Sequence, residues 1–164
     1  MIRGRQALGP AVSAQAQTAT TPEQAFAFVS ALENHWHIDD RYLRLERLPV
    51  GGYGGRIRIR TPLGLARTAQ TDLTTTVAPH LVGGTATVGA RTRARVYWTI
   101  EPAAHGSHIS LAADLLDVGP VDRLLLSLGG RWWLRRRFDR VLERLVLVLE
   151  RGSAGEAAAP VRVA

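Results

Sequence analysis

The beginning of the chain has first a strand pattern and then a helical one. Residues 12–19 alternate small apolar and polar side chains, which is the period of a strand with one buried face. The tract Thr21-Pro22-Glu23-Gln24 predicts a helix start, since threonine caps, proline fits the first helical position and glutamine completes a capping box. Apolar residues then recur at helical spacing at Ala25, Phe28, Val29 and Leu32. A second short helical turn is predicted over residues 34–40.

From residue 41 to residue 117 the helical period gives way to successive strand patterns separated by turn residues. In residues 56–60 and 91–96 arginines alternate with small or aliphatic residues. Each of these strands is therefore expected to have one solvent-exposed face and one buried face. With the first strand, the pattern predicts seven strands. The six later ones span residues 42–48, 56–61, 65–77, 80–88, 91–101 and 108–117.

A long helix is predicted after Gly119-Pro120, ending near Arg151. Its apolar stripe changes phase by roughly 110° at Gly129-Gly130, which predicts a kink at this glycine pair. Residues 152–164 are rich in alanine, glycine and proline without periodicity, so a disordered tail is expected. The predicted organisation is a flexible arm over 1–10, one domain over 11–151 and a tail over 152–164.

Composition and charge exclude several classes of function. The chain has no cysteine, which excludes disulfides, thiolate metal sites and a cysteine nucleophile. No run approaches the roughly 18 apolar residues of a membrane span, so a cytoplasmic protein without a transmembrane segment is expected.

The net charge is +7, and all 21 basic residues are arginines. Runs such as Arg135-Arg136-Arg137 are first interpreted as solvated faces. Because no nucleic-acid-binding motif accompanies them, no specific nucleic-acid binding is expected. Transient contact with an anionic membrane surface, or binding of an acidic ligand, is the favoured alternative.

The order of these elements resembles the helix-grip fold of the SRPBCC superfamily, which includes START domains, pollen allergens and polyketide cyclase/dehydrase proteins. The resemblance covers residues 11–151 and rests on the tract from Thr21 to Val29, the glycine-rich residues 51–55 and Gly119-Pro120. It implies an α+β fold, in which a curved seven-stranded antiparallel sheet wraps around a long C-terminal helix, with two short helices after the first strand. It also implies a cavity for a small hydrophobic molecule between sheet and helix, with no cofactor.

The densest group of potentially catalytic side chains is His35-Trp36-His37 followed by Asp39-Asp40. Histidines two positions apart on a helix point about 200° apart, and no third ligand is visible, so no metal site is expected. Two interpretations stay open for this segment. It either lines the mouth of the cavity with one histidine directed inward, or forms a surface turn.

Strand alternation and helix phase predict a cavity wall with few ionisable groups. The predicted ligand-binding residues are Phe28, Val29, Trp36, Ile57, Ile59, Val96, Trp98, Leu111 and Trp132.

Three functions follow as hypotheses. The first is binding or carriage of a lipid, polyketide or similar molecule. The second is a polyketide cyclase or dehydratase in which His35 or His37, with Asp39 or Asp40, polarises or deprotonates the substrate. The third is a basic interaction module without a small ligand.

Overall fold

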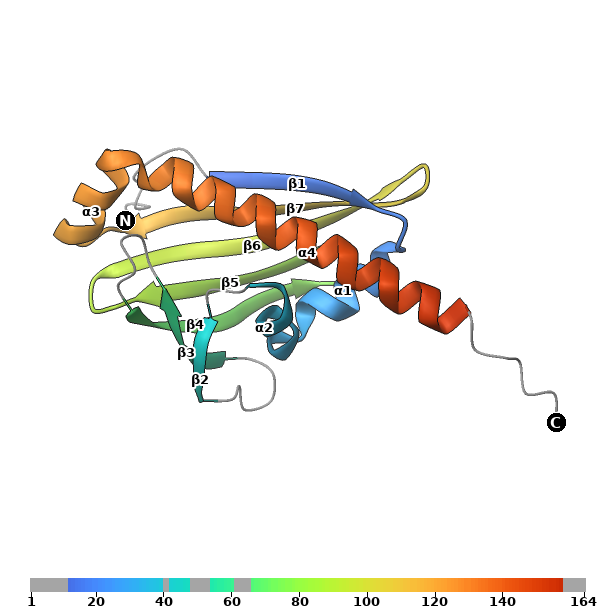
Figure 1. The fold of residues 1–164 in the computed structure, drawn as a ribbon, viewed down its shortest axis with the longest axis horizontal. Coiled ribbons are helices and arrows are strands. Elements are labelled where there is room, and N and C mark those ends of the chain that lie inside the picture. The colour runs from blue at the N-terminus through green and yellow to red at the C-terminus, as the bar shows by residue number, and fades with distance from the viewer. Residues whose placement is uncertain (1–11, 40–41, 48–53, 61–65, 158–164) are drawn as a thin grey trace, which may run out of the picture.

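The computed structural model describes residues 12–39, 42–47, 54–60 and 66–157. All strands form one antiparallel sheet with seven members, in the order β1-β7-β6-β5-β4-β3-β2. Strands β2 to β7 therefore form a continuous meander, and β1 joins its far edge beside β7 (Figure 1). The strands are β1 Val12–Thr18, β2 Tyr42–Arg47, β3 Gly54–Arg60, β4 Ala66–Val77, β5 Leu81–Val88, β6 Thr92–Ala103 and β7 Gly106–Asp117.

The short helices follow β1 as predicted. Helix α1, Pro22–Ser30, begins at a capping box in which the Gln24 amide donates to the Thr21 hydroxyl and the Thr21 amide donates to the Gln24 side chain, each at 3.4 Å. A 3-10 turn, η1 (Leu32–Asn34), leads into α2, His35–Ile38. These elements lie at one end of the sheet (Figure 1).

The C-terminal helical tract is interrupted where the glycine pair predicts. Helix α3, Pro120–Leu125, passes through a π-helical turn, η4 (Leu126–Gly130), into α4, Arg131–Ala157. Gly129 has a φ of 102°, which residues with a side chain rarely adopt. A Cβ on Gly130 would lie 2.6 Å from the Leu125 carbonyl oxygen, so the chain turns too tightly there for any larger residue. Helix α4 continues to Ala157, beyond the predicted end near Arg151.

Helix α4 crosses the sheet and packs closely against β1 (Figure 1). In the described part of the chain, most of the buried apolar side chains fall into two separate clusters. The larger joins α1, α2 and α4 to the half of the sheet around β6 and β7, through residues such as Val29, Ile100 and Leu145. The smaller comprises Ile57, Ile59 and Ala69, with Val88 packed against it.

The alternation predicted from the arginines is present in both strands concerned. Ile57 and Ile59 are buried between the exposed Arg56, Arg58 and Arg60, and Trp98 and Ile100 are buried on β6, where Arg93 and Arg95 are exposed. The α+β class, the antiparallel sheet and the long C-terminal helix of the helix-grip fold are therefore confirmed. The predicted arm over 1–10 and the end of the predicted tail lie outside the described residues.

Candidate functional site

A cavity of about 280 Å³ separates the two buried clusters. Its walls come from the inner faces of β3 to β7, from η1 and α2 on one side, and from α3, η4 and the start of α4. Most of the wall is aliphatic or aromatic, and it includes Val82, Val88, Leu115, Leu126, Trp133, Leu134, Phe138 and Val141. The cavity exists because α4 packs on the β1 side of the sheet, and its side chains do not reach the smaller cluster on β3 and β4.

Five of the predicted ligand-binding residues line this wall: Ile57, Ile59, Val96, Trp98 and Leu111. All five lie on strands, where the two-residue period decides which face a side chain takes. Their role toward a ligand stays a prediction.

Three helical members of the prediction do not line the cavity. Val29 is fully buried in the larger cluster, and Phe28 packs against that cluster instead of the cavity. The placement of Trp132 in the pocket was wrong: its side chain is 63% exposed and the Arg136 guanidinium lies 4.8 Å from its ring centre. The neighbouring Trp133 lines the cavity, because the turn before Arg131 sets the phase of α4. The side chain of Trp36 lies outside those described, as does the catalytic candidate Asp40.

His35 lines the cavity, and its ring is fixed by two contacts. Its Nε2 lies 2.7 Å from the carbonyl oxygen of Val29, and its ring meets the Trp98 indole edge-on at a centroid distance of 5.6 Å. Burial lowers the pKa of His35 below 6.5, although the Val29 hydrogen bond and the charge of Glu33 oppose this shift. A carbonyl oxygen only accepts, so the neutral ring carries its proton on Nε2 and a lone pair on Nδ1.

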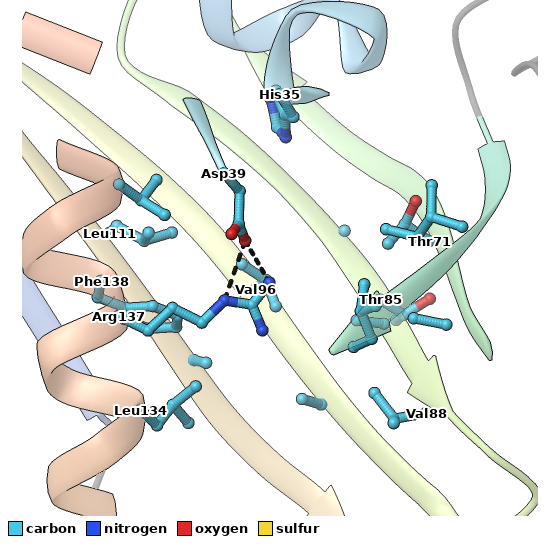
Figure 2. Close-up of a pocket in the computed structure, with 18 of the residues that line it drawn as sticks. His35, Asp39, Thr71, Thr85, Val88, Val96, Leu111, Leu134, Arg137 and Phe138 are labelled. Atoms are coloured by element: carbon cyan, nitrogen blue, oxygen red, sulfur yellow. Dashed lines mark hydrogen bonds and ion pairs between the residues drawn. The ribbon is translucent and has the colours of Figure 1, made fainter. Parts of the chain in front are cut away.

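Asp39 and Arg137 form a buried ion pair on the same wall. The Arg137 Nε donates to Asp39 Oδ2 at 2.9 Å, and Nη2 lies close to the same oxygen. The two side chains are only 16% and 6% exposed for arginine and aspartate, respectively. Figure 2 shows the pair in the middle of the cavity, with His35 beyond it and Thr71 and Thr85 on the opposite wall.

Sequence reasoning missed Arg137 because it belongs to a run of three arginines, interpreted as a solvated face. The helical period contained the signal: Arg137 lies three residues after Leu134 and four before Val141, on the face that lines the cavity. The expectation of few ionisable groups on the wall was therefore wrong.

A second polar cluster closes the cavity beside α3. Asp122 accepts hydrogen bonds from Arg67 of β4 and from the Thr92 hydroxyl of β6, and the Gly119 amide donates to Thr92 Oγ1 at 3.2 Å. All three side chains line the cavity. The cluster fastens α3 to the sheet, and no local pattern in the sequence indicates a contact between residues so far apart.

The family described as polyketide cyclase / dehydrase and lipid transport matches residues 10–150, which is most of the chain. The chain belongs to this family. Membership places it in the SRPBCC superfamily that its element order resembles. A comparison with curated proteins finds no match.

Several solved structures share the fold at low sequence identity. TTHA0849 from Thermus thermophilus is 17% identical, with a TM-score of 0.67 over 88% of this chain and 99% of its own. A START superfamily protein from Mycobacterium smegmatis is 15% identical, with a TM-score of 0.65 over 87% of this chain and 99% of its own. SA2116 from Staphylococcus aureus, a protein of unknown function, is 12% identical, with a TM-score of 0.65 over 88% of this chain and 96% of its own.

The remaining candidates in this family member lie away from the cavity or form no site. His37 is exposed and does not line the cavity. Among the described residues, no three histidine, aspartate or glutamate side chains gather as metal ligands would. No helix in the described part of the chain is long and apolar enough to span a membrane.

Proposed function

We propose that the protein binds a small hydrophobic molecule inside the cavity. The observation that carries this proposal is the apolar wall to which strands β3 to β7 and helix α4 all contribute. A volume of about 280 Å³ is near the lower end of that typical of small-molecule sites. The family description, which names lipid transport beside cyclase and dehydrase activity, supports the same class of ligand.

The polar groups on the wall favour a ligand that carries an oxygen atom. The Arg137 Nε and Nη2 are directed at Asp39, which leaves Nη1 pointing away from the carboxylate (Figure 2). A carbonyl, hydroxyl or carboxylate oxygen accepts hydrogen bonds from such a donor. The ligand that fits best is therefore mainly apolar, with an acceptor oxygen placed against Arg137.

Native mass spectrometry of freshly purified protein tests the proposal most directly. A co-purified apolar molecule, released on unfolding, is the expected result. Binding can also be measured by titration with a fluorescent apolar probe. The probe binds if the cavity is open and is excluded if it is occupied, so the natural ligand need not be known.

Filling the cavity provides a matched pair of variants. Val96→Phe places a larger side chain on the wall and should weaken probe binding at least about tenfold, or roughly 1.4 kcal/mol. Val77→Phe is the control, because Val77 is 52% exposed on β4 and does not line the cavity. Equal probe binding by the wild type and both variants would show that the probe does not enter this cavity, and would contradict the proposal.

His35 supports catalysis as the second candidate function. A neutral imidazole on the cavity wall, with Nε2 committed to Val29, has a lone pair on Nδ1 that is available to a substrate proton. A polyketide cyclase or dehydratase would use this nitrogen as a general base toward a cavity-bound poly-β-keto chain. Asp39 is engaged by Arg137, so the aspartate would position the arginine.

The two functions respond differently to one substitution. If the protein is a carrier, His35→Ala should change probe affinity only slightly and there is no turnover to lose. If it is a cyclase or dehydratase, His35→Ala should abolish turnover of a poly-β-keto substrate while the substrate still binds.

A further inference from the structure

A strip of exposed apolar side chains extends along α3, the turn η4 and the first residues of α4. Six large apolar side chains are prominently exposed in the described part of the chain, and four of them fall between residues 121 and 132. They recur every three or four residues and are Val121, Leu124, Leu128 and Trp132. Leu128, at the point where the backbone leaves helical geometry, is the most exposed of the six at 75%. Such clustering in a small domain is typical of an interaction surface.

Arginines surround this strip. Arg123, Arg131, Arg135 and Arg136 are all exposed or partly exposed, and Arg136 stacks over the Trp132 ring. Asp122 is the only acidic residue between positions 118 and 138, and its carboxylate is held by Arg67 and Thr92. The stretch from Val121 to Arg136 therefore exposes apolar and positively charged side chains, and its one carboxylate is engaged by Arg67 and Thr92.

The inner face of the same stretch lines the cavity. Leu125, Leu126, Gly130, Trp133 and Leu134 lie on the cavity wall, so one layer of helix separates the exposed strip from the cavity. Figure 1 shows α3 and the start of α4 together at the end of the sheet opposite α1 and α2. A partner that contacts the strip is thus directly outside the cavity.

We propose that the stretch from Val121 to Arg136 docks on the surface of an anionic lipid bilayer. The positive charge of the arginines complements anionic headgroups, and leucine, valine and tryptophan flanked by arginine are the residues that helical segments in the bilayer interface present to lipid. The apolar side chains enter the headgroup boundary, Trp132 lies at the interface and the arginines contact lipid phosphates. This inference does not require a ligand in the cavity, so it can fail or hold independently of the function proposed above.

Vesicle co-sedimentation tests the proposal with phosphatidylcholine vesicles and with vesicles of phosphatidylcholine mixed with phosphatidylserine. The expected result is binding to the mixed vesicles only, weakening as salt is added. The affinity of the variant Leu124→Asp/Leu128→Asp for the mixed vesicles should be at least roughly tenfold weaker. Two apolar side chains that would enter the headgroup boundary are replaced by charged ones, which stay in water. Leu147→Asp is the matched control. Leu147 is exposed as well, but it lies further along α4 and outside the strip.

A charge-reversal pair separates local docking from overall charge. Arg131→Glu/Arg135→Glu should weaken binding by roughly twenty-fold or more, at about fivefold for each arginine removed. Arg56→Glu/Arg58→Glu changes the net charge equally on exposed residues of β3 and should have a much smaller effect. Thermal unfolding of each variant identifies any that fail to fold, and Leu128→Ser provides a milder substitution at the most exposed position.

Three outcomes would overturn the proposal. The first is no binding of the wild type to anionic vesicles at low salt. The second is equal weakening by the β3 charge reversal, which would make the attraction a property of the whole molecule. The third is a strip variant that retains vesicle binding but changes the oligomeric state in sedimentation, which would assign the strip to contact between copies of this chain.

Discussion

Burial determines the chemistry of His35. The sequence places it in a short polar segment with His37, and nothing local distinguishes the two residues. In the fold His35 turns toward Trp98 and the Val29 carbonyl, whereas His37 is exposed. The loss of water around the His35 ring disfavours its charged form and lowers its pKa.

Stability should depend on pH through this residue. The unfolded chain binds a proton at His35 near pH 6.5, whereas the folded protein resists it, so the free energy of unfolding falls as pH drops below 6.5. Above pH 6.5 His35 is neutral in both the folded and the unfolded chain, so no stability is lost through this residue there. Urea unfolding at several pH values between about 7.5 and 5.5 measures it.

His35→Phe is the control for the pH dependence. It keeps an aromatic ring against Trp98 but cannot bind a proton, so its free energy of unfolding should fall less steeply with acidification. Parallel pH profiles for the variant and the wild type would contradict the assignment to His35.

At the scale of elements, two contacts hold the helices over the cavity. The pair between Asp39 and Arg137 joins the end of α2 to α4, and the cluster around Asp122 joins α3 to β4 and β6. Both are polar contacts on a mainly apolar wall. Each links a helix that borders the cavity to an element on another part of its wall.

Breaking the buried pair should destabilise the protein strongly. Asp39→Ala leaves the largely buried Arg137 charge without this partner, which should cost about 3–5 kcal/mol. The double variant Asp39→Ala/Arg137→Met should lose less than the sum of the two single variants. Chemical unfolding of the four proteins measures this coupling.

The exposed pair of Arg93 and Asp117 is the control for that cycle. Its nitrogen and oxygen lie 3.9 Å apart, with the arginine 56% exposed, so its coupling should be about 0–1 kcal/mol. Similar coupling energies for the two pairs would contradict the prediction that burial strengthens the ion pair between Asp39 and Arg137.

The turn between α3 and α4 should depend on the glycine at its positive φ. Gly129→Ala meets no atom within 4 Å, but its φ of 102° should cost about 1–2 kcal/mol of backbone strain. Gly152→Ala also enters open space, within helical geometry, and should stabilise the protein by about 0.5–1 kcal/mol. Thermal unfolding compares them, and effects of the same sign would contradict this explanation.

At the scale of the whole molecule, the arginines divide between the two sides of the sheet. Arg56, Arg58 and Arg60 on β3 and Arg93 and Arg95 on β6 point away from the cavity, opposite the apolar residues of the same strands. Arg67 and Arg137 instead lie on the cavity wall. The net charge of +7 is therefore mainly a property of the outer surface, and it favours weak attraction to any polyanion.

Nucleic-acid binding should be weak and without sequence preference. Contacts between arginine and phosphate release counterions, so affinity for a DNA duplex should fall steeply between low salt and ~0.2 M salt. Fluorescence anisotropy with two duplexes of unrelated sequence measures both properties. Tight binding at the higher salt concentration, or a clear preference for one duplex, would support the basic interaction module instead.

The sequence by itself determined the features that obey local rules. The alternation of isoleucine with arginine assigned Ile57 and Ile59 to the inner face, because successive side chains of a strand point to opposite faces. The capping box located the start of α1, and Gly129-Gly130 located the break in the last helix. In each case the physical cause lies within a few residues, so the feature can be predicted from the sequence without the tertiary structure.

Only the tertiary structure decided which helical side chains reach the cavity. Adjacent residues of a helix point about 100° apart, so the rotation of α4 about its axis decides that Trp133 and Arg137 face the cavity and Trp132 does not. That rotation is set by the turn at Gly129 and Gly130. The partners of Asp39, His35 and Asp122 lie on other elements, and the cavity exists because α4 packs toward β1. These features depend on the relative placement of whole elements, which arises from packing and leaves no periodic signal in the chain.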